Sequence, residues 1–224
     1  PECKQALFDG LDELQVDFAH TKLFLTHLHG DHSGLTEELT ARGVPVFMNA
    51  IDYNYLCQEL ASGGWQAMEQ IFLSEGFPME EIEKQKKGNQ ARLYSPHHPF
   101  PASKVSDNDL LTVGGITLRC IHTPGHTPGH TCLYIEDKEI LFSGDHILFD
   151  ITPNISVWRN IPYSLADYLE SLQKIKGLKV SHTFPGHREF HGDIHDRINA
   201  LTLHHHARLK EILDAIDHHP DCTA

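Results

Sequence analysis

The chain has 224 residues, 40% of them hydrophobic, which is enough for one domain with a sizeable core. Its 31 acidic and 18 basic residues give a formal charge of −13, and this balance opposes a long-range attraction to nucleic acid or to an anionic membrane. Five cysteines without a CxxC pair, and the lack of a long apolar stretch in the sequence, predict a soluble cytoplasmic protein with reduced thiols and no membrane partner.

The first half of the chain predicts strands that alternate with helices, which is the pattern of an α/β fold. In chain order we expect a helix over residues 4–16, a strand over 22–26, a helix over 35–42 and a strand over 46–48. Residues 51–87 then have helical spacing that glycine-containing turns interrupt. We interpret residues 51–103, approximately, as a helical insertion.

The second half predicts short strands followed by two helices. Turns rich in glycine or charge separate strands that we expect over residues 110–113, 116–121, 131–135 and 140–142, and we interpret these as a β-meander. The pattern then predicts a helix over 163–176, a strand over 179–184 and a long helix over 193–216 within a C-terminal segment 193–224. All of these elements fit a single domain over residues 1–224.

Histidine is in large excess, with 19 residues, and three of them gather directly after the first predicted strand. The run from His27 to His32 places His27, His29, Asp31 and His32 within six residues. A loop can turn these side chains toward one point, and a divalent cation binds such imidazole and carboxylate groups at about 2 Å. Without a cation, so many polar groups would be poorly satisfied. The run therefore predicts a metal site.

Three further candidates follow glycines in turns that end predicted strands. They are His126, Asp145 and His187, in the sequences TPGH, FSGD and FPGH. A glycine at each turn permits close approach of the backbone. Spacing alone does not distinguish His126 from His122 or His130 as the ligand.

These motifs resemble those of the metallo-β-lactamase superfamily, in which HxHxDH is followed by a histidine, an aspartate and a last histidine in separate glycine turns. The resemblance spans Leu23 to His187 and implies an αββα sandwich. It also implies that one ion is held by His27, His29 and His126, that the other is held by Asp31, His32 and His187, and that Asp145 bridges them. The family pattern makes His130 a donor behind the site and His122 a packed strand residue. Two zinc ions are expected, although this ligand set also accepts iron or manganese.

In such a site a hydroxide shared by the two ions is the nucleophile, and Asp31 is the catalytic residue that orients it and passes a proton to the leaving group. Differences from three subfamilies at single positions make their substrates less suitable for this chain. Asp145 stands where zinc β-lactamases of the best-known class have cysteine, Arg188 where glyoxalase II has a glutathione-contacting tyrosine, and Leu148 where quorum-quenching lactonases have a catalytic tyrosine.

Our leading hypothesis is hydrolysis of a small-molecule ester, thioester or lactone, because the acidic composition suits a compact substrate. A phosphodiesterase or endoribonuclease acting on nucleic acid is the alternative, since the C-terminal residues also resemble the lactamase-like endoribonucleases. An iron-dependent, oxygen-consuming enzyme of the same fold is a second alternative. In the endoribonucleases a winged-helix module follows the last helix, and the fold usually has further strands before HxHxDH. We therefore expect truncated N-terminal strands and a missing C-terminal module.

Overall fold

A computed structural model describes residues 2–62, 64–88 and 93–218 of the chain. Its first sheet is parallel and has the strand order β1-β2-β3. The strands are β1 (Leu23–Leu25), β2 (Val46–Asn49) and β3 (Ser103–Val105). Parallel neighbours need a crossover connection. Between β2 and β3 this connection contains the helices of the predicted insertion, α4 (Ala50–Ser62), α5 (Gly64–Ser74) and α6 (Met79–Gly88).

The second sheet has five strands in the order β4-β5-β6-β7-β8. They are β4 (Leu110–Val113), β5 (Ile116–His122), β6 (Thr131–Ile135), β7 (Ile140–Gly144) and β8 (His182–Pro185). The first four pair antiparallel, which confirms the predicted meander, and a short 3-10 turn, η2 (Glu136–Lys138), joins β6 to β7. The last strand returns through a helix and pairs parallel to β7.

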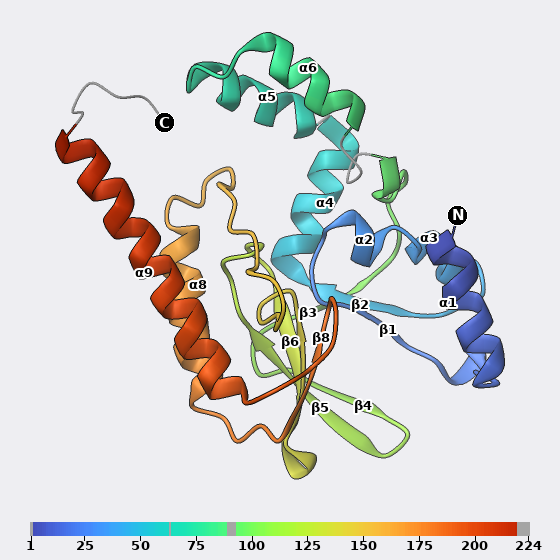
Figure 1. Cartoon of the computed structure of the whole chain (residues 1–224). Coiled ribbons are helices and arrows are strands. Elements are labelled where there is room, and N and C mark those ends of the chain that lie inside the picture. The colour runs from blue at the N-terminus through green and yellow to red at the C-terminus, as the bar shows by residue number, and fades with distance from the viewer. Residues whose placement is uncertain (1, 63, 89–92, 219–224) are drawn as a thin grey trace.

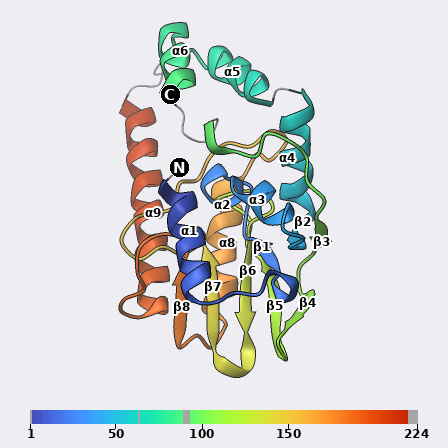
Figure 2. The ribbon, with the colours of Figure 1, turned by 90° about the vertical axis from the view of Figure 1, so that its right-hand side faces the viewer.

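Helices cover the outer faces of the two sheets. They include α8 (Ser164–Lys176) and α9 (Ile194–His218), which lie beside the five-stranded sheet, whereas α4 lies on the side of the three-stranded sheet (Figure 1). The helices α5 and α6 extend beyond α4, at the end of the molecule away from the β4–β5 hairpin (Figures 1 and 2). The layer order is thus the predicted helix, sheet, sheet, helix arrangement.

Alternation along the strands builds this sandwich, because successive side chains point to opposite faces of a sheet. In β5, Ile121 packs in the core formed with α8 and α9, whereas Cys120 packs between the sheets. In β1, Phe24 joins the layer between the sheets and Leu25 joins the core on the α4 side. Each sheet therefore buries both faces.

The boundaries differ from expectation in three places. The helix expected over 35–42 is the shorter α3 (Thr36–Thr40), and it is preceded by a short helix that was not expected, α2 (Gly30–Ser33), within the His27 to His32 run. The short strand β3 was not predicted, because three residues are too few to display a period. The strand expected to begin at Lys179 begins at His182, since the Lys179 carbonyl accepts a hydrogen bond from the Tyr134 hydroxyl instead of pairing in the ladder.

The segment before β1 forms α1 (Glu2–Glu13) and the short 3-10 helix η1 (Phe18–His20), and β1 lies at the edge of its sheet. The predicted final helix is α9, and it continues to His218. Among the helices in the described residues, none combines the length and the apolar character needed to cross a bilayer.

Candidate metal centre

The candidate ligands lie where four strands end at the same side of the two sheets. The loop after β1 carries His27, His29, Asp31 and His32, the turn between β5 and β6 carries His126, and the residues after β7 and β8 include Asp145 and His187. The sheets are joined here by a hydrogen bond of 2.9 Å from the Thr131 N–H, at the start of β6, to the Thr26 carbonyl, after β1. Strand ends thus place residues distant in sequence around one point.

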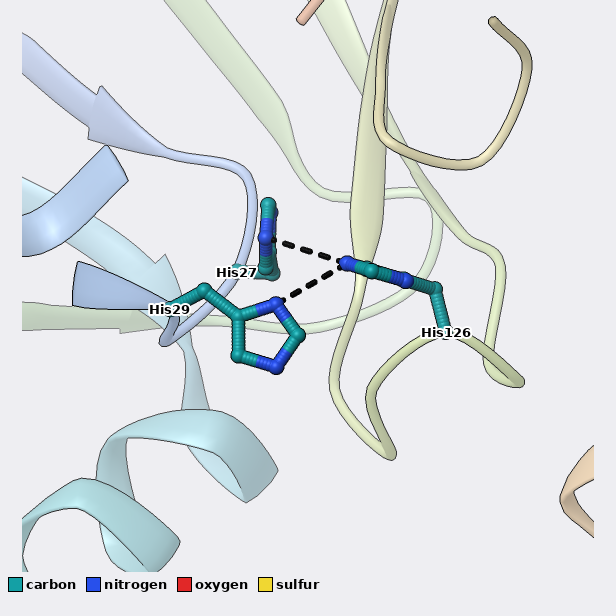
Figure 3. Close-up of side chains that lie close together, drawn as sticks. All are labelled: His27, His29 and His126. Carbon is teal, nitrogen blue, oxygen red and sulfur yellow. Dashed lines mark hydrogen bonds between the residues drawn. The ribbon is translucent and has the colours of Figure 1, made fainter. Parts of the chain in front are cut away.

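The first group consists of three imidazoles that meet through their ring nitrogens (Figure 3). His29 Nδ1 lies 2.9 Å from His126 Nε2, and His27 Nε2 lies 3.3 Å from the same atom. His27 and His126 are buried. This is the grouping that the family pattern implied for one ion.

The second group lies beside it and contains Asp31, His32 and His187. His32 Nε2 and His187 Nε2 are 3.2 Å apart, and Asp31 Oδ2 is 3.2 Å from His187 Nε2. The Asp31 side chain is 58% exposed and that of His187 is 37% exposed. This group therefore faces solvent, whereas the first group is enclosed.

Asp145 lies between the two groups. One of its oxygens, Oδ2, is 3.6 Å from His126 Nε2 and 3.3 Å from His187 Nε2, and its other oxygen is 3.3 Å from His32 Nε2. Burial raises the pKa of Asp145, but the hydrogen bond to His32 and the charges of the neighbouring histidines together outweigh burial, so the pKa is lowered overall. An ionised carboxylate therefore stands at the position expected of a bridge.

A glycine makes room for this carboxylate. A Cβ on Gly186, directly before His187, would lie 2.3 Å from Asp145 Oδ1 and 2.9 Å from a ring carbon of His32. No side chain fits at that distance. The glycine turn before His187 thus has a steric reason, which the sequence pattern indicated only in general terms.

The electrostatics differ between the two groups. Burial lowers the pKa of His27 well below its usual value, lowers that of His29 to about 4 and lowers that of His126. These rings are neutral near pH 7, which is the form that binds metal. Burial also acts on His32, but the hydrogen bond and charge of Asp145 raise the pKa of His32 overall. The carboxylates therefore favour positive charge at this end of the cluster.

Neighbouring groups fix the orientation of His126 and His29. The Nδ1–H of His126 donates to the Asn154 carbonyl at 2.7 Å, so the lone pair of its Nε2 faces the cluster. Trp158 donates from Nε1 to the His126 carbonyl at 3.2 Å and stacks on the His29 ring with centroids 6.0 Å apart. Such partners hold metal-binding imidazoles in one orientation and tautomer.

The structure also gives different surroundings to the three histidines that spacing alone did not distinguish, His122, His126 and His130. His130 is fully buried behind the cluster, where its Nε2 accepts a hydrogen bond from the Asp145 N–H at 3.1 Å and its Nδ1 bonds the Thr123 hydroxyl at 2.8 Å. Because Nε2 accepts, the ring proton is on Nδ1, and His130 donates it to the Thr123 hydroxyl behind the cluster. His122 ends β5 and donates to the Pro128 carbonyl at 2.9 Å. Of the three, only His126 faces the other candidate ligands.

A model of the metallo-beta-lactamase superfamily matches residues 20–187. The chain belongs to this superfamily. Among solved structures it is similar to a metallo-beta-lactamase family protein from Thermus thermophilus, with 31% identity and a TM-score of 0.81 over 96% of this chain and 70% of that one. The fold predicted from the sequence is thereby confirmed.

Two curated relatives of this superfamily align with most of the chain. A beta-lactamase-like protein 2 homolog from Caenorhabditis elegans is 26% identical, over 90% of this chain and 54% of its own length. An atrochrysone carboxyl ACP thioesterase from a Cryptosporiopsis species is 24% identical, over 91% of this chain and 48% of its own length. The chain thus spans about half the length of these relatives.

The residues of this superfamily member fit a divalent cation. Ring nitrogens and carboxylate oxygens converge, and the seven candidate side chains form groups whose ligand atoms lie within 4.8 Å of one another. Nitrogen and oxygen ligands of this kind suit zinc, iron or manganese. The cluster could therefore hold a divalent metal ion, whereas the identity and number of the ions are proposals.

Three residues that contact the site were not predicted from the sequence. Asp52 lies in a helical run without any motif, yet its carboxylate contacts both the loop after β1 and the turn after β5. Asn154 contributes a backbone carbonyl, which any residue could supply, and Trp158 lies in an irregular segment. The sequence contained no local signal for these contacts.

Two buried histidines outside the candidate ligands predict a pH dependence of stability. Burial lowers the pKa of His130 well below its usual value and that of His146 to about 3. Because histidines in the unfolded chain titrate near pH ~6.5, the unfolded state binds protons below this pH that the folded state does not bind. Stability is therefore complete above about pH 6.5 and is lost on acidification. Well below pH ~6.5 each histidine should remove about 1.4 kcal/mol per pH unit from the free energy of unfolding, and about half as much near pH ~6.5.

Urea unfolding of the metal-free protein at about pH 7.5, 6.5 and 5.5 measures this slope. Between about pH 6.5 and 5.5, a His130→Gln variant should have a slope that is smaller by about 1 kcal/mol per pH unit. A free energy of unfolding that does not change across this range would contradict the prediction.

Proposed function

We propose that this chain is a dinuclear, metal-dependent hydrolase of a thioester or a related small ester, and that its metal is zinc. The observation that carries the proposal is the convergence of seven nitrogen- and oxygen-bearing side chains from four strand ends. The two groups share Asp145 as a near neighbour, which suits two ions rather than one. A divalent ion held there supplies a Lewis acid and lowers the pKa of a water molecule.

The residues of the two groups would have different roles in metal binding and proton transfer. His27, His29 and His126 form the enclosed group and hold their ion in a fixed geometry. Asp31 is the exposed carboxylate of the second group, and its Oδ2 lies 3.2 Å from His187 Nε2. From this place Asp31 can accept a proton from the attacking water and return it to the leaving group. In a thioester the C–S bond breaks, the acyl carbon gains the hydroxyl, and the sulfur gains the proton.

The thioester is preferred among the possible substrates for two reasons. Curated relatives from Cryptosporiopsis and from Aspergillus fumigatus are named as atrochrysone carboxyl ACP thioesterases. The formal charge of −13 also disfavours a long polyanion such as RNA, whose binding depends on neutralising phosphates with basic side chains. A phosphodiesterase activity is therefore the outcome that the test must be able to detect.

The test compares turnover of acyl thioesters, matched oxygen esters and a labelled single-stranded RNA by the zinc-loaded protein. We expect thioester hydrolysis, and we expect Asp31→Asn to lower its kcat by about 10² to 10⁴-fold, the usual contribution of a general acid or base. The control is Asp12→Asn, which changes an exposed carboxylate of α1 that is not among the candidate ligands. This variant should retain wild-type kcat. Cleavage of RNA alone, lost in Asp31→Asn, would replace the proposed function by the nuclease alternative.

A further inference from the structure

Asp52 is a fully buried carboxylate in the first turn of α4. Its Oδ2 accepts hydrogen bonds from the Leu28 N–H at 3.0 Å and from the Thr127 hydroxyl at 2.6 Å. Its Oδ1 accepts from the Gly129 N–H at 2.5 Å. Burying a carboxylate is costly unless such donors satisfy it, so this arrangement has a strict geometric requirement.

The donors belong to the two segments that carry the enclosed histidine group. Leu28 stands between His27 and His29, and Thr127 follows His126 directly. The Asp52 carboxylate therefore connects the backbone beside two of these histidines to the turn that carries the third. None of the candidate ligands of the exposed group is adjacent in sequence to Thr127 or Gly129.

The approach of α4 to the turn is close. A Cβ on Gly129 would lie 2.4 Å from the Asp52 backbone nitrogen and 2.7 Å from its Oδ1, so a larger residue would push the helix and the turn apart. Neighbouring contacts hold the start of α4 in place. Asn49 accepts from the Ile51 N–H at 2.9 Å and donates from Nδ2 to the Thr131 hydroxyl at 3.1 Å.

We propose that Asp52 is the positioning residue of the enclosed metal group. It fixes the separation between the loop that carries His27 and His29 and the turn that carries His126. This inference rests on the proposed function, because it concerns how tightly that group binds its ion. Asparagine at this position would keep the size of the side chain but replace one acceptor by a donor, which would oppose at least one of the three donors.

The experiment measures cobalt(II) binding, by the visible bands of the bound ion, in two single-group backgrounds. The His187→Ala background retains the enclosed group, and the His29→Ala background retains the exposed group. In the His187→Ala protein, Asp52→Asn should raise the Kd for cobalt by about 10 to 100-fold, the usual effect of losing a partner that orients metal ligands. In the His29→Ala protein the Kd should change by less than about threefold.

A milder variant guards against loss of folding. Thr127→Val removes one donor and should raise the Kd in the His187→Ala background by a smaller factor than Asp52→Asn does. Two controls accompany it. Asp109→Asn alters an exposed carboxylate that accepts a hydrogen bond from the nearby Ser106 N–H. Leu172→Ala lowers the stability of the fold by a change in the core beside α8 and α9, away from Asp52. Each control should change the Kd for cobalt by the same factor in the His187→Ala and His29→Ala backgrounds.

The outcomes separate this inference from the proposed function. Equal weakening of both groups by Asp52→Asn, or no weakening of either, would overturn the positioning role while cobalt binding by the wild-type chain kept the proposed metal centre intact. Failure of the wild-type chain to bind cobalt would overturn the proposed function, and the positioning role with it.

Discussion

Alanine in place of Asp145 should lower kcat/KM for the preferred substrate by about 10³-fold or more, the scale of loss seen when a central part of a catalytic unit is removed. The reason is the position of this carboxylate, which lies within 3.6 Å of ring nitrogens from both histidine groups. Its removal leaves each group without its shared anionic neighbour. Steady-state kinetics of the zinc-supplemented variant, with metal content measured on the same sample, test this prediction.

A matched control lies five residues along the same segment. Asp150 is also an aspartate, but its side chain is 45% exposed and pairs with His191. Asp150→Ala should therefore retain kcat/KM to within a small factor. Equal losses in the two variants would show that the segment, and not the Asp145 carboxylate, limits activity.

Metal removal should have the second large effect, a decrease in melting temperature of about 10 °C. An ion that binds only the folded state, at about 1,000 times its Kd, stabilises that state by about 4 kcal/mol. For a chain of this size each kcal/mol corresponds to roughly 2 to 4 °C. The physical cause is that the folded chain holds the imidazoles and carboxylates close together, whereas the unfolded chain separates them. Differential scanning calorimetry before and after chelation, and after addition of zinc, measures the change.

The control for chelation is the double variant His126→Ala/His187→Ala, which removes one ring from each group. Its melting temperature should be the same with and without chelator. If the wild-type protein and this variant responded alike, the stabilising ion would be bound elsewhere in the chain.

The fold and most of the candidate site follow from local features of the sequence. His27 to His32 stand within one short run after an apolar strand, so their meeting requires only a loop. The meander from β4 to β7 is antiparallel and built from neighbouring hairpins, and its turns are visible as glycine and charged residues. The insertion was predicted for the same reason, because helical spacing persists over each of α4, α5 and α6.

Contacts between distant segments were not predictable in this way. The direction in which His130 points depends on the Thr123 hydroxyl and the Asp145 N–H, and neither partner has a sequence signal. Asp52 is one of 31 acidic residues and lies in a helix with ordinary spacing. Its importance comes from a hydrogen-bond geometry that exists only after the sheets have met.

The measurement that tests the central claim most directly is the count and location of metal ions in the purified, zinc-supplemented protein, by elemental analysis and anomalous X-ray diffraction from crystals. We expect two ions per chain, one among His27, His29 and His126 and the other among Asp31, His32 and His187, with Asp145 in contact with both. Anomalous density that is absent from this cluster, in crystals grown with excess zinc, would contradict it.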